Sequence, residues 1–414
     1  MKNVKYDLVI MGATGFTGKL VVEYLIKYYG VKNEKFTWAI AGRNQKKLNK
    51  VKNSFDHIDS RSNNIPTIVV DSHSPTLLDS MTSSCRLVIS TVGPYLKFGK
   101  LLIESCVKNS THYCDLTGEV PFIRDSIDLF DLKAKENNCR IIHSCGFDSI
   151  PSDIGVHLLQ TEALKRFNKP CDEVYLYVQS MRGGFSGGTI DSMINISKYI
   201  ASDPEHHKIL KSPFALNPRE SLKNNTHQPS LKSVKWNDNI KRWVCPFIMS
   251  GINTRVVRRT NALTDYRYGY NFRYSEVYSF RKGIKGFFRA MIMLIALVSI
   301  QVSIKARPLL WILKKYYLPM SGEGPSKEKR ENGFFKLNII GSVNNIEKNT
   351  IAVIGNSDPG YSASAKMISE SALSILLDHE RIPKVCGVLT PASGIGTILA
   401  ERLKDKGIKF VLNK

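Results

Sequence analysis

The sequence holds no pair of cysteines at the CxxC spacing and no cluster of cysteine and histidine at the spacing of metal ligands. Its eight cysteines are spread along the chain instead, which indicates reduced thiols in a reducing compartment and argues against a zinc site. The amino terminus, MKNVKYDLVIMGATG, enters a predicted strand almost at once. We therefore expect an intracellular protein without a signal or transit peptide and without a bound metal.

Acidic residues are in short supply, because 36 Asp and Glu stand against 59 Lys and Arg and leave a formal net charge of +23. Such a surface attracts phosphates, anionic lipid or nucleic acid. Aromatic and basic residues interleave over 264–283, but the aromatic residues from Tyr266 to Tyr274 recur with period two, which is typical of a strand with one apolar face. We therefore predict a strand there and no nucleic-acid partner.

A glycine-rich turn follows the first predicted strand. Residues 6–11 (YDLVIM) have strand length, and GATGFTG and an amphipathic helical pattern come next. In this arrangement the first glycine permits a tight turn, the second lets the backbone approach a pyrophosphate, and the third lets the helix pack on the strand. The residues predicted to bind a dinucleotide in this loop are Gly12, Thr14, Gly15 and Gly18.

The second predicted strand, 36–44, ends in Gly42-Arg43. Folds that bind NAD usually carry an acidic residue at this point, which holds the ribose hydroxyls. A guanidinium suits a 2′-phosphate instead, so NADP(H) is favoured over NAD(H) as the cofactor. The alternative is an arginine that only faces solvent.

Further strand candidates alternate with helical spacers, which predicts an α/β fold with a Rossmann-type, doubly wound parallel sheet. Ligands of such sheets bind at the carboxyl ends of the strands. This position selects Asp71, Thr91 and Gly93 as cofactor neighbours, although turn chemistry alone can also explain each of them. The strand candidates are 66–71, 86–95, 112–116 and 140–145.

The Tyr-Lys pair of short-chain dehydrogenases is missing from the nucleotide unit. The YxxxK pattern occurs at Tyr28/Lys32, at the end of the first predicted helix, and at Tyr278/Lys282, far outside the unit. Neither pair is expected to face a nicotinamide. The proton of a reduction must therefore come from another side chain.

Several motifs together resemble the saccharopine dehydrogenase-like oxidoreductases, a family that also includes the bacterial trans-acting enoyl reductases of long-chain lipid assembly. The resemblance runs in order along nearly the whole chain. Its motifs are GATGFTG with AGR, STVGPY, YCDLTGE, CGFDSIPSDIG, GGFSGGT, GEGPSKEKRENGFF, DPGYSASAKM and GVLTPASGIGTILAERL.

The resemblance implies a Rossmann domain over 1–170, a second mixed α/β domain over 171–345, and a carboxy-terminal segment, 346–414, that packs back on the first domain. It also implies nicotinamide-dependent reduction connected with lipids. We therefore expect an NADP(H)-dependent oxidoreductase that acts on a lipid-linked or apolar substrate. A non-catalytic nucleotide-binding scaffold or sensor on membranes is the alternative, and saccharopine dehydrogenase activity is a weaker one.

Two residues are candidates for the proton donor. Tyr113 in YCDLTGE and Asp148 in CGFDSIPSD both follow strand candidates and should open on the cofactor crevice. Asp148 is equally well explained as part of a helix start, with Ser149 or Ser152 as the cap and Pro151 in the first turn.

An apolar run, 287–313, interrupts the second predicted domain. Ala290 to Ile304 holds fifteen residues without a charge, a helix of roughly 22 Å, which is short for the ~30 Å hydrocarbon core of a bilayer. Basic residues flank the run on both sides, and Pro308 marks a bend. This pattern favours a monotopic element on the cytoplasmic face of a membrane or on a lipid droplet, and leaves mitochondrial association open. A buried helix or the face of a possible homodimer is the rival interpretation.

Overall fold

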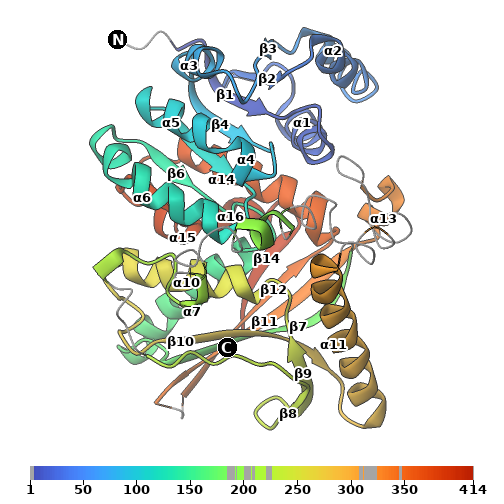
Figure 1. Cartoon of the computed structure of the whole chain (residues 1–414), viewed down its shortest axis with the longest axis vertical. Helices are drawn as coiled ribbons and strands as arrows, with labels where there is room; N and C mark the ends of the chain where they lie inside the picture. The colour runs from blue at the N-terminus through green and yellow to red at the C-terminus, as the bar shows by residue number, and fades with distance from the viewer. Residues whose placement is uncertain are drawn as a thin grey trace.

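The computed structural model describes residues 4–183, 192, 194–199, 207, 210–220, 226–306, 311, 324–344 and 347–413. Two sheets organise this part of the chain, and Figure 1 shows the first sheet at one end of the molecule and the second at the other. A hydrophobic core runs through both without interruption.

The first sheet is entirely parallel, with strand order β13-β6-β5-β4-β1-β2-β3. Its central strands are buried along most of their length, as expected for a sheet covered by helices on both faces. The predicted doubly wound α/β fold is confirmed. The strands are β1 (Tyr6–Met11), β2 (Trp38–Gly42), β3 (Thr67–Val69), β4 (Cys85–Ser90), β5 (His112–Asp115), β6 (Arg140–Ile142) and β13 (Gly387–Leu389).

Helices connect these strands and cover the sheet. Within the described residues they are α1 (Phe16–Tyr29), α2 (Gln45–Asn53), α3 (Pro75–Ser83), α4 (Tyr95–Phe98), α5 (Lys100–Lys108) and α6 (Val120–Glu136), with the short 3-10 helix η1 (Ser60–Asn64) before β3. The helix α7 (Ile150–Phe167) then leads from the first sheet to the second.

The second sheet is mixed, with strand order β14-β12-β11-β7-β10-β9-β8. Only the β10–β7 pair is parallel among the described pairs of this sheet. Its strands are β7 (Glu173–Arg182), β8 (Lys235–Asn237), β9 (Arg242–Pro246), β10 (Arg273–Phe280), β11 (Phe334–Val343), β12 (Glu347–Gly355) and β14 (Ile408–Asn413). Helices α10 (Ser250–Leu263), α11 (Ile284–Lys305) and α13 (Lys327–Glu331) are inserted between them.

The segment after 346, expected to pack back on the first domain, contributes to both sheets. Helix α14 (Ser364–Leu377) packs against α1, and β13 extends the first sheet next to β6, but β12 and β14 pair in the second sheet. The remaining elements of this segment are the π-helical turn η3 (Pro359–Ala363), α15 (Pro391–Gly394) and α16 (Ile398–Lys404).

The strand predicted over the aromatic stretch begins later than its alternation indicates. Residues 264–272 form turns, because Asp265, Tyr266 and Gly269 have positive φ angles that a strand cannot accommodate. The rings pair at a spacing of four instead, and Tyr266 stacks on Tyr270 at 4.4 Å between centroids. The prediction is therefore wrong before Arg273 and right for β10.

Helix α11 is mostly exposed, although it is strongly apolar. It has 22 residues, about 33 Å at 1.5 Å per residue, and is long and apolar enough to cross a membrane, while only 17% of its most apolar window is buried in the protein. Figure 1 shows it at the side of the second sheet, where it contacts β9 and β10. The helix is therefore not a core helix of this chain. Most of the predicted Pro-marked bend, from 307 on, lies outside the described residues.

Candidate active site

The glycine loop between β1 and α1 has the geometry of a pyrophosphate cradle. Gly12 has a φ of +88°, and a Cβ there would lie 2.7 Å from Thr91 Oγ1. A Cβ on Gly18 would lie 2.2 Å from the carbonyl oxygen of Gly12, so only glycine lets α1 approach the loop this closely. Gly15 occupies the N-cap position, and no side chain caps the helix. The backbone N–H groups at the start of α1 are therefore open to an anion.

The loop residues differ in whether they line the large cavity, of about 1140 Å³, that lies beside the loop. Gly15, Phe16 and Thr17 line it, whereas Gly12 does not. Thr14 does not line the cavity and faces β2, since its Cγ2 lies 3.6 Å from the position that a Cβ on Gly42 would take. Gly12 and Gly18 thus shape the cradle, and Gly15 can touch a bound ligand.

Arg43 is exposed at the end of β2 and lines the cavity together with Lys47. Arg43 has no salt-bridge partner among the residues that the structure describes. Lys47 lies in the first turn of α2, four residues after Arg43, and that spacing on a helix start could have revealed it in the sequence. Two exposed cations beside the glycine loop suit a phosphate group.

Asp71 lies near these cations but does not line the cavity. Its carboxylate accepts hydrogen bonds from the backbone N–H of His73 at 2.9 Å and from the ring of His73 at 3.1 Å. These bonds, with a smaller contribution from the charge of Arg43, lower the pKa of Asp71. The structure therefore places Asp71 in a turn at the edge of the cofactor end.

The turn after β4 lies on the opposite side of the glycine loop. Thr91 and Gly93 both line the cavity, and Thr91 Oγ1 donates to the carbonyl oxygen of Met11 at 3.1 Å. Glu119 holds the following turn, because its two carboxylate oxygens accept from the N–H groups of Tyr95 and Leu96 at 3.0 and 2.8 Å. Burial raises the pKa of Glu119. Sequence reasoning did not identify this positioning role, which depends on a contact across 24 residues.

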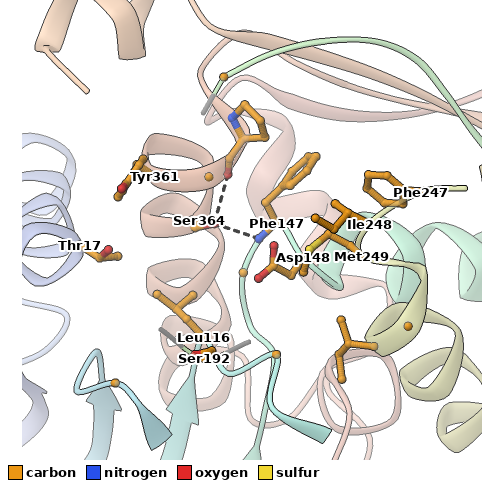
Figure 2. Close-up of a pocket in the computed structure, with 18 of the residues that line it drawn as sticks. Thr17, Leu116, Phe147, Asp148, Ser192, Phe247, Ile248, Met249, Tyr361 and Ser364 are labelled. Carbon is orange, nitrogen blue, oxygen red and sulfur yellow. Dashed lines mark hydrogen bonds between the residues drawn. The ribbon is translucent and has the colours of Figure 1, made fainter. Parts of the chain in front are cut away.

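Asp148 lies in the wall of the cavity, in the loop between β6 and α7. Figure 2 shows its carboxylate beside Phe147 and close to the apolar group Phe247, Ile248 and Met249. No hydrogen bond to its carboxylate occurs within the described part of the chain, and burial raises its pKa to about 6. Such a carboxyl can be protonated near neutral pH and can donate its proton to a ligand in the cavity.

The helix-start interpretation of Asp148 is confirmed in position, because Ser149 occupies the N-cap of α7 directly after Asp148 and Pro151 follows in the first turn. The hydroxyl of Ser149 donates to Asn253 Oδ1 at 3.2 Å instead of capping the helix. Asp148 precedes the cap and has no structural partner among the described residues.

Tyr113 is not placed to deliver a proton to a ligand, which corrects the prediction that it could. Its side chain is fully buried in β5 and does not line the cavity. Its hydroxyl donates to Asp115 at 3.0 Å, and Asp115 also pairs with His143 at 2.7 Å. Period-two alternation puts a residue on one face of a strand but does not reveal which face is covered. Tyr113 belongs to a buried polar network under the first sheet.

A single cavity of about 1140 Å³ joins the features described above. Ligand pockets are commonly ~300–1,000 Å³, so this one has room for a dinucleotide portion and a second ligand together. Its cofactor end contains the glycine loop and Arg43, and Asp148 lies in its wall. The far end is lined mainly by apolar residues of the second sheet and its helices, which are Val178, Met181, Phe247, Ile248, Met249, Ile252, Tyr278, Phe280, Met293 and Phe334. The polar residues Gln179, Ser180, Ser279 and Arg255 also line this end.

The carboxy-terminal segment closes the cavity on one side. Tyr361 packs edge-on against Phe16 of the glycine loop, with 4.8 Å between ring centroids, and both residues line the cavity. The guanidinium of Arg330 lies 5.4 Å from the centroid of the Phe16 ring. Residues 324–333 and the motif DPGYSASAK thus meet at the nucleotide loop. Within the described residues no group of His, Cys, Asp and Glu side chains could hold a metal ion.

Comparison with known proteins agrees with this geometry. Residues 8–143 match the family model described as the saccharopine dehydrogenase NADP binding domain. A protein of Mycobacterium tuberculosis (strain ATCC 25618 / H37Rv), provisionally named a trans-acting enoyl reductase, is 34% identical over 417 residues, which cover 98% of this chain and 97% of the relative. The trans-acting enoyl reductase of Mycobacterium ulcerans (strain Agy99) is 31% identical over 421 residues, with the same two coverages.

Among solved structures, the apo saccharopine dehydrogenase (L-Glu forming) of Saccharomyces cerevisiae aligns over 99% of both chains with a TM-score of 0.52 and 13% identity, and it therefore shares the fold. The amino-terminal match assigns the cofactor end of the cavity to NADP binding, in agreement with the cradle and the cations found there. The chain belongs to the saccharopine dehydrogenase-like, NAD(P)-dependent oxidoreductases, in the group that contains the proteins named trans-acting enoyl reductase.

Proposed function

We propose that this oxidoreductase uses NADPH to reduce a lipid-linked or otherwise apolar substrate at the surface of a membrane or lipid droplet. The observation that carries the proposal is the continuity of the cavity, which runs from the phosphate cradle past Asp148 to a wall made of apolar side chains. A substrate in the far end would meet few charges and much apolar surface. Burial of apolar groups there would supply most of its binding free energy.

Asp148 is the proposed proton donor. Bound NADPH would supply the hydride at the cofactor end, where Gly93 lines the cavity, and the reduced bond also requires one proton. The carboxyl of Asp148 faces the cavity, and its raised pKa keeps part of it protonated near neutral pH. Glu119 and Ser364 would act by positioning, because they hold the Tyr95 turn and the Phe147 loop.

Saccharopine is a less suitable substrate for this cavity. A substrate with several carboxylates calls for several cations at the substrate end. Among the described residues, Arg255 is the cation that lines this end, and its guanidinium already donates to the carbonyl oxygens of Ser212, Gly251 and Leu210. The apolar lining therefore favours a lipid-like substrate over saccharopine.

Contact with lipid is proposed for the outer face of α11. The exposed side chains there are large and apolar: Ile284, Phe288, Ile292, Ile295, Val298 and Val302. Exposed basic residues, Arg281, Lys282, Lys285 and Arg289, gather at its amino-terminal end and suit anionic headgroups. Because the other face packs on β9 and β10, a helix lying in one leaflet fits better than a helix that spans the bilayer. A homodimer through the same face is the rival occupant.

A single-turnover experiment tests the proposed function. Purified protein is mixed with NADPH carrying deuterium at the transferred position and with a lipid extract, and the lipids are analysed by mass spectrometry. Deuterium in a lipid product, lost in the Asp148→Asn variant, supports the proposal. Oxidation of NADPH without label in any lipid would contradict the substrate class. If the protein binds NADPH but does not oxidise it, the result would favour a nucleotide-binding scaffold.

A further inference from the structure

The apolar end of the cavity and the exposed face of α11 are two sides of one helix. Met293 lines the cavity, while Ile292 and Ile295 on the outer side are 66% and 58% exposed. The width of one helix, α11, therefore separates the cavity from the surface that we propose to contact lipid.

The exposure of the cavity lining changes along this end. Phe247, Met249, Ile252 and Tyr278 are all buried, and Ile252 lies on the side of Asp148, since a Cβ on Gly118 would lie 4.0 Å from Ile252 and 3.9 Å from Asp148. Phe280 and Met293 are partly exposed, and Phe334 is 41% exposed. The gradient places the mouth of the apolar end at Phe280, Met293 and Phe334, beside α11.

From this arrangement we infer that the apolar end holds a long unbranched acyl chain, which enters from the lipid surface past Phe280 and Met293. The inference rests on the proposed function and specifies its substrate class. The chain would lie against Phe247, Met249 and Ile252, and its functional group would lie at Asp148. A lipid-embedded chain could then pass from lipid to cavity along α11 without exposing its methylene groups to water. Such exposure would cost free energy.

The size and chemistry of the lining support an acyl chain over a compact ring system. The flexible thioether side chains of Met249 and Met293 adapt to a flexible chain, and Ile252 adds apolar surface beside them. Asp148 is the carboxyl among the residues that line the cavity, and the positive charge of Arg255, which lines the same cavity, offsets it toward a carboxyl or carbonyl head.

Binding of fatty acids tests the inference without requiring turnover. The probe is a palmitic acid that carries a diazirine near its methyl end, and octanoic, lauric and palmitic acids compete with it in the presence of NADPH. Each further buried methylene should tighten binding about fourfold, so affinity should rise steeply from octanoic to palmitic acid. Photo-cross-links should map to Phe280, Met293 or Phe334. Equal affinities for the three acids, or cross-links confined to the outer face of α11, would overturn the inference.

Two variants of α11 make the test specific. Met293→Trp narrows the mouth. It should weaken the binding of palmitic acid at least tenfold and change the affinity for octanoic acid by no more than about twofold. Ile292→Trp, the matched control, adds the same ring to the outer face and should leave both affinities unchanged. If Met293→Trp does not fold, Met293→Gln keeps the length of the side chain and should weaken palmitic acid through its polarity. Equal effects of the Met293 and Ile292 variants would contradict the proposed mouth.

The outcome separates this inference from the proposed function. Chain-length-dependent binding without deuterium transfer to any lipid would leave the acyl site standing and remove the proposed reduction. Deuterium transfer to a lipid, together with fatty-acid affinities that do not depend on chain length, would keep the reduction and remove the acyl-chain site.

Discussion

The backbone N–H of Phe147 donates a hydrogen bond to Oγ of Ser364 at 3.1 Å, across 217 residues of sequence. Ser364 Oγ in turn donates to the carbonyl oxygen of Pro359 at 3.2 Å, as the dashed lines in Figure 2 show. The loop that carries Asp148 is thereby attached to the segment whose Tyr361 packs on Phe16 of the nucleotide loop. The proposed acid and the cofactor cradle are positioned by one carboxy-terminal turn.

Replacement of Ser364 by Ala should therefore disturb the site more than the fold. The buried N–H of Phe147 would lose its acceptor, at a cost of about 1–3 kcal/mol. We expect a lower kcat with little change in NADPH affinity, because the loop that positions Asp148 would relax. Steady-state kinetics and an NADPH titration separate the two effects, and Ser364→Thr should restore most of the rate. Equal losses of kcat and NADPH affinity would indicate a general structural role.

Arg43→Gln should weaken the binding of NADPH about 10- to 100-fold and leave the affinity for NADH unchanged. A hydrogen bond to a charged group contributes about 1.5–3 kcal/mol, and 1.4 kcal/mol corresponds to a factor of ten. Fluorescence titration of both nucleotides measures the effect. Lys46→Gln is the matched control, because Lys46 is exposed beside the site without lining the cavity. An unchanged preference between NADPH and NADH would show that Arg43 only faces solvent.

Asp148→Asn should abolish proton donation and leave NADPH binding intact. In the wild-type protein the rate of reduction should fall as the pH rises above about 6, because the acid must be protonated. A pH profile of single-turnover rates checks both statements. A variant with an unchanged rate at pH 6 would remove Asp148 from the mechanism.

The raised pKa of Asp148 also predicts how the stability of the folded protein depends on pH. Burial raises the pKa of Asp148 from 3.8 to about 6, so the folded protein holds this proton more tightly than the unfolded chain. Its contribution to stability is present below about pH 4 and is lost as the pH rises through 6. Asp148→Asn should therefore be at least as stable as the wild type at pH 8. Thermal melts at pH 5 and pH 8 measure this, and a variant that melts lower at both would point to a structural role.

Gly18→Ala should impair both folding and cofactor binding. The new Cβ would lie 2.2 Å from the carbonyl oxygen of Gly12, which forces α1 away from the glycine loop at a cost of about 1–3 kcal/mol. Gly251→Ala is the control for stability, because nothing lies within 4 Å of its Cβ and alanine favours a helix by about 0.5–1 kcal/mol. Thermal melts with and without NADPH compare the two. Equal behaviour of the variants would contradict the close approach.

Replacement of Phe288, Ile292 and Ile295 by Gln should release the protein from vesicles that contain anionic lipid. These side chains are exposed, so the free energy of unfolding and the NADPH affinity should change little. Flotation of vesicles measures the release. Leu297→Ala is the contrasting variant, because Leu297 is buried, and it should lose about 2–5 kcal/mol of stability. If the triple variant stays bound and elutes at half the mass in solution, the face is a dimer interface.

Much of the first sheet could be predicted from local patterns. The strand, the glycine turn and the helix follow one another in consecutive residues, so β1 and α1 were predictable. The cation at Arg43 was predictable because it follows the second strand directly. The aromatic alternation before β10 misled the prediction, because period two in the sequence also arises when rings pair four residues apart in turns. Tyr113 and Asp148 looked alike in sequence, since each is a polar residue in or just after a predicted strand.

The sequence by itself determined the doubly wound sheet, the dinucleotide cradle and the apolar character of α11, because these follow from spacing and side-chain type within short segments. Only the tertiary structure decided that Tyr113 is buried while Asp148 faces the cavity, that the DPGYSASAK segment holds the Phe147 loop, and that Met293 lines the cavity while Ile292 is exposed. The physical reason is that burial and long-range hydrogen bonds depend on which surfaces meet. Phe147 and Ser364, for example, lie 217 residues apart in the sequence and meet only in the folded chain.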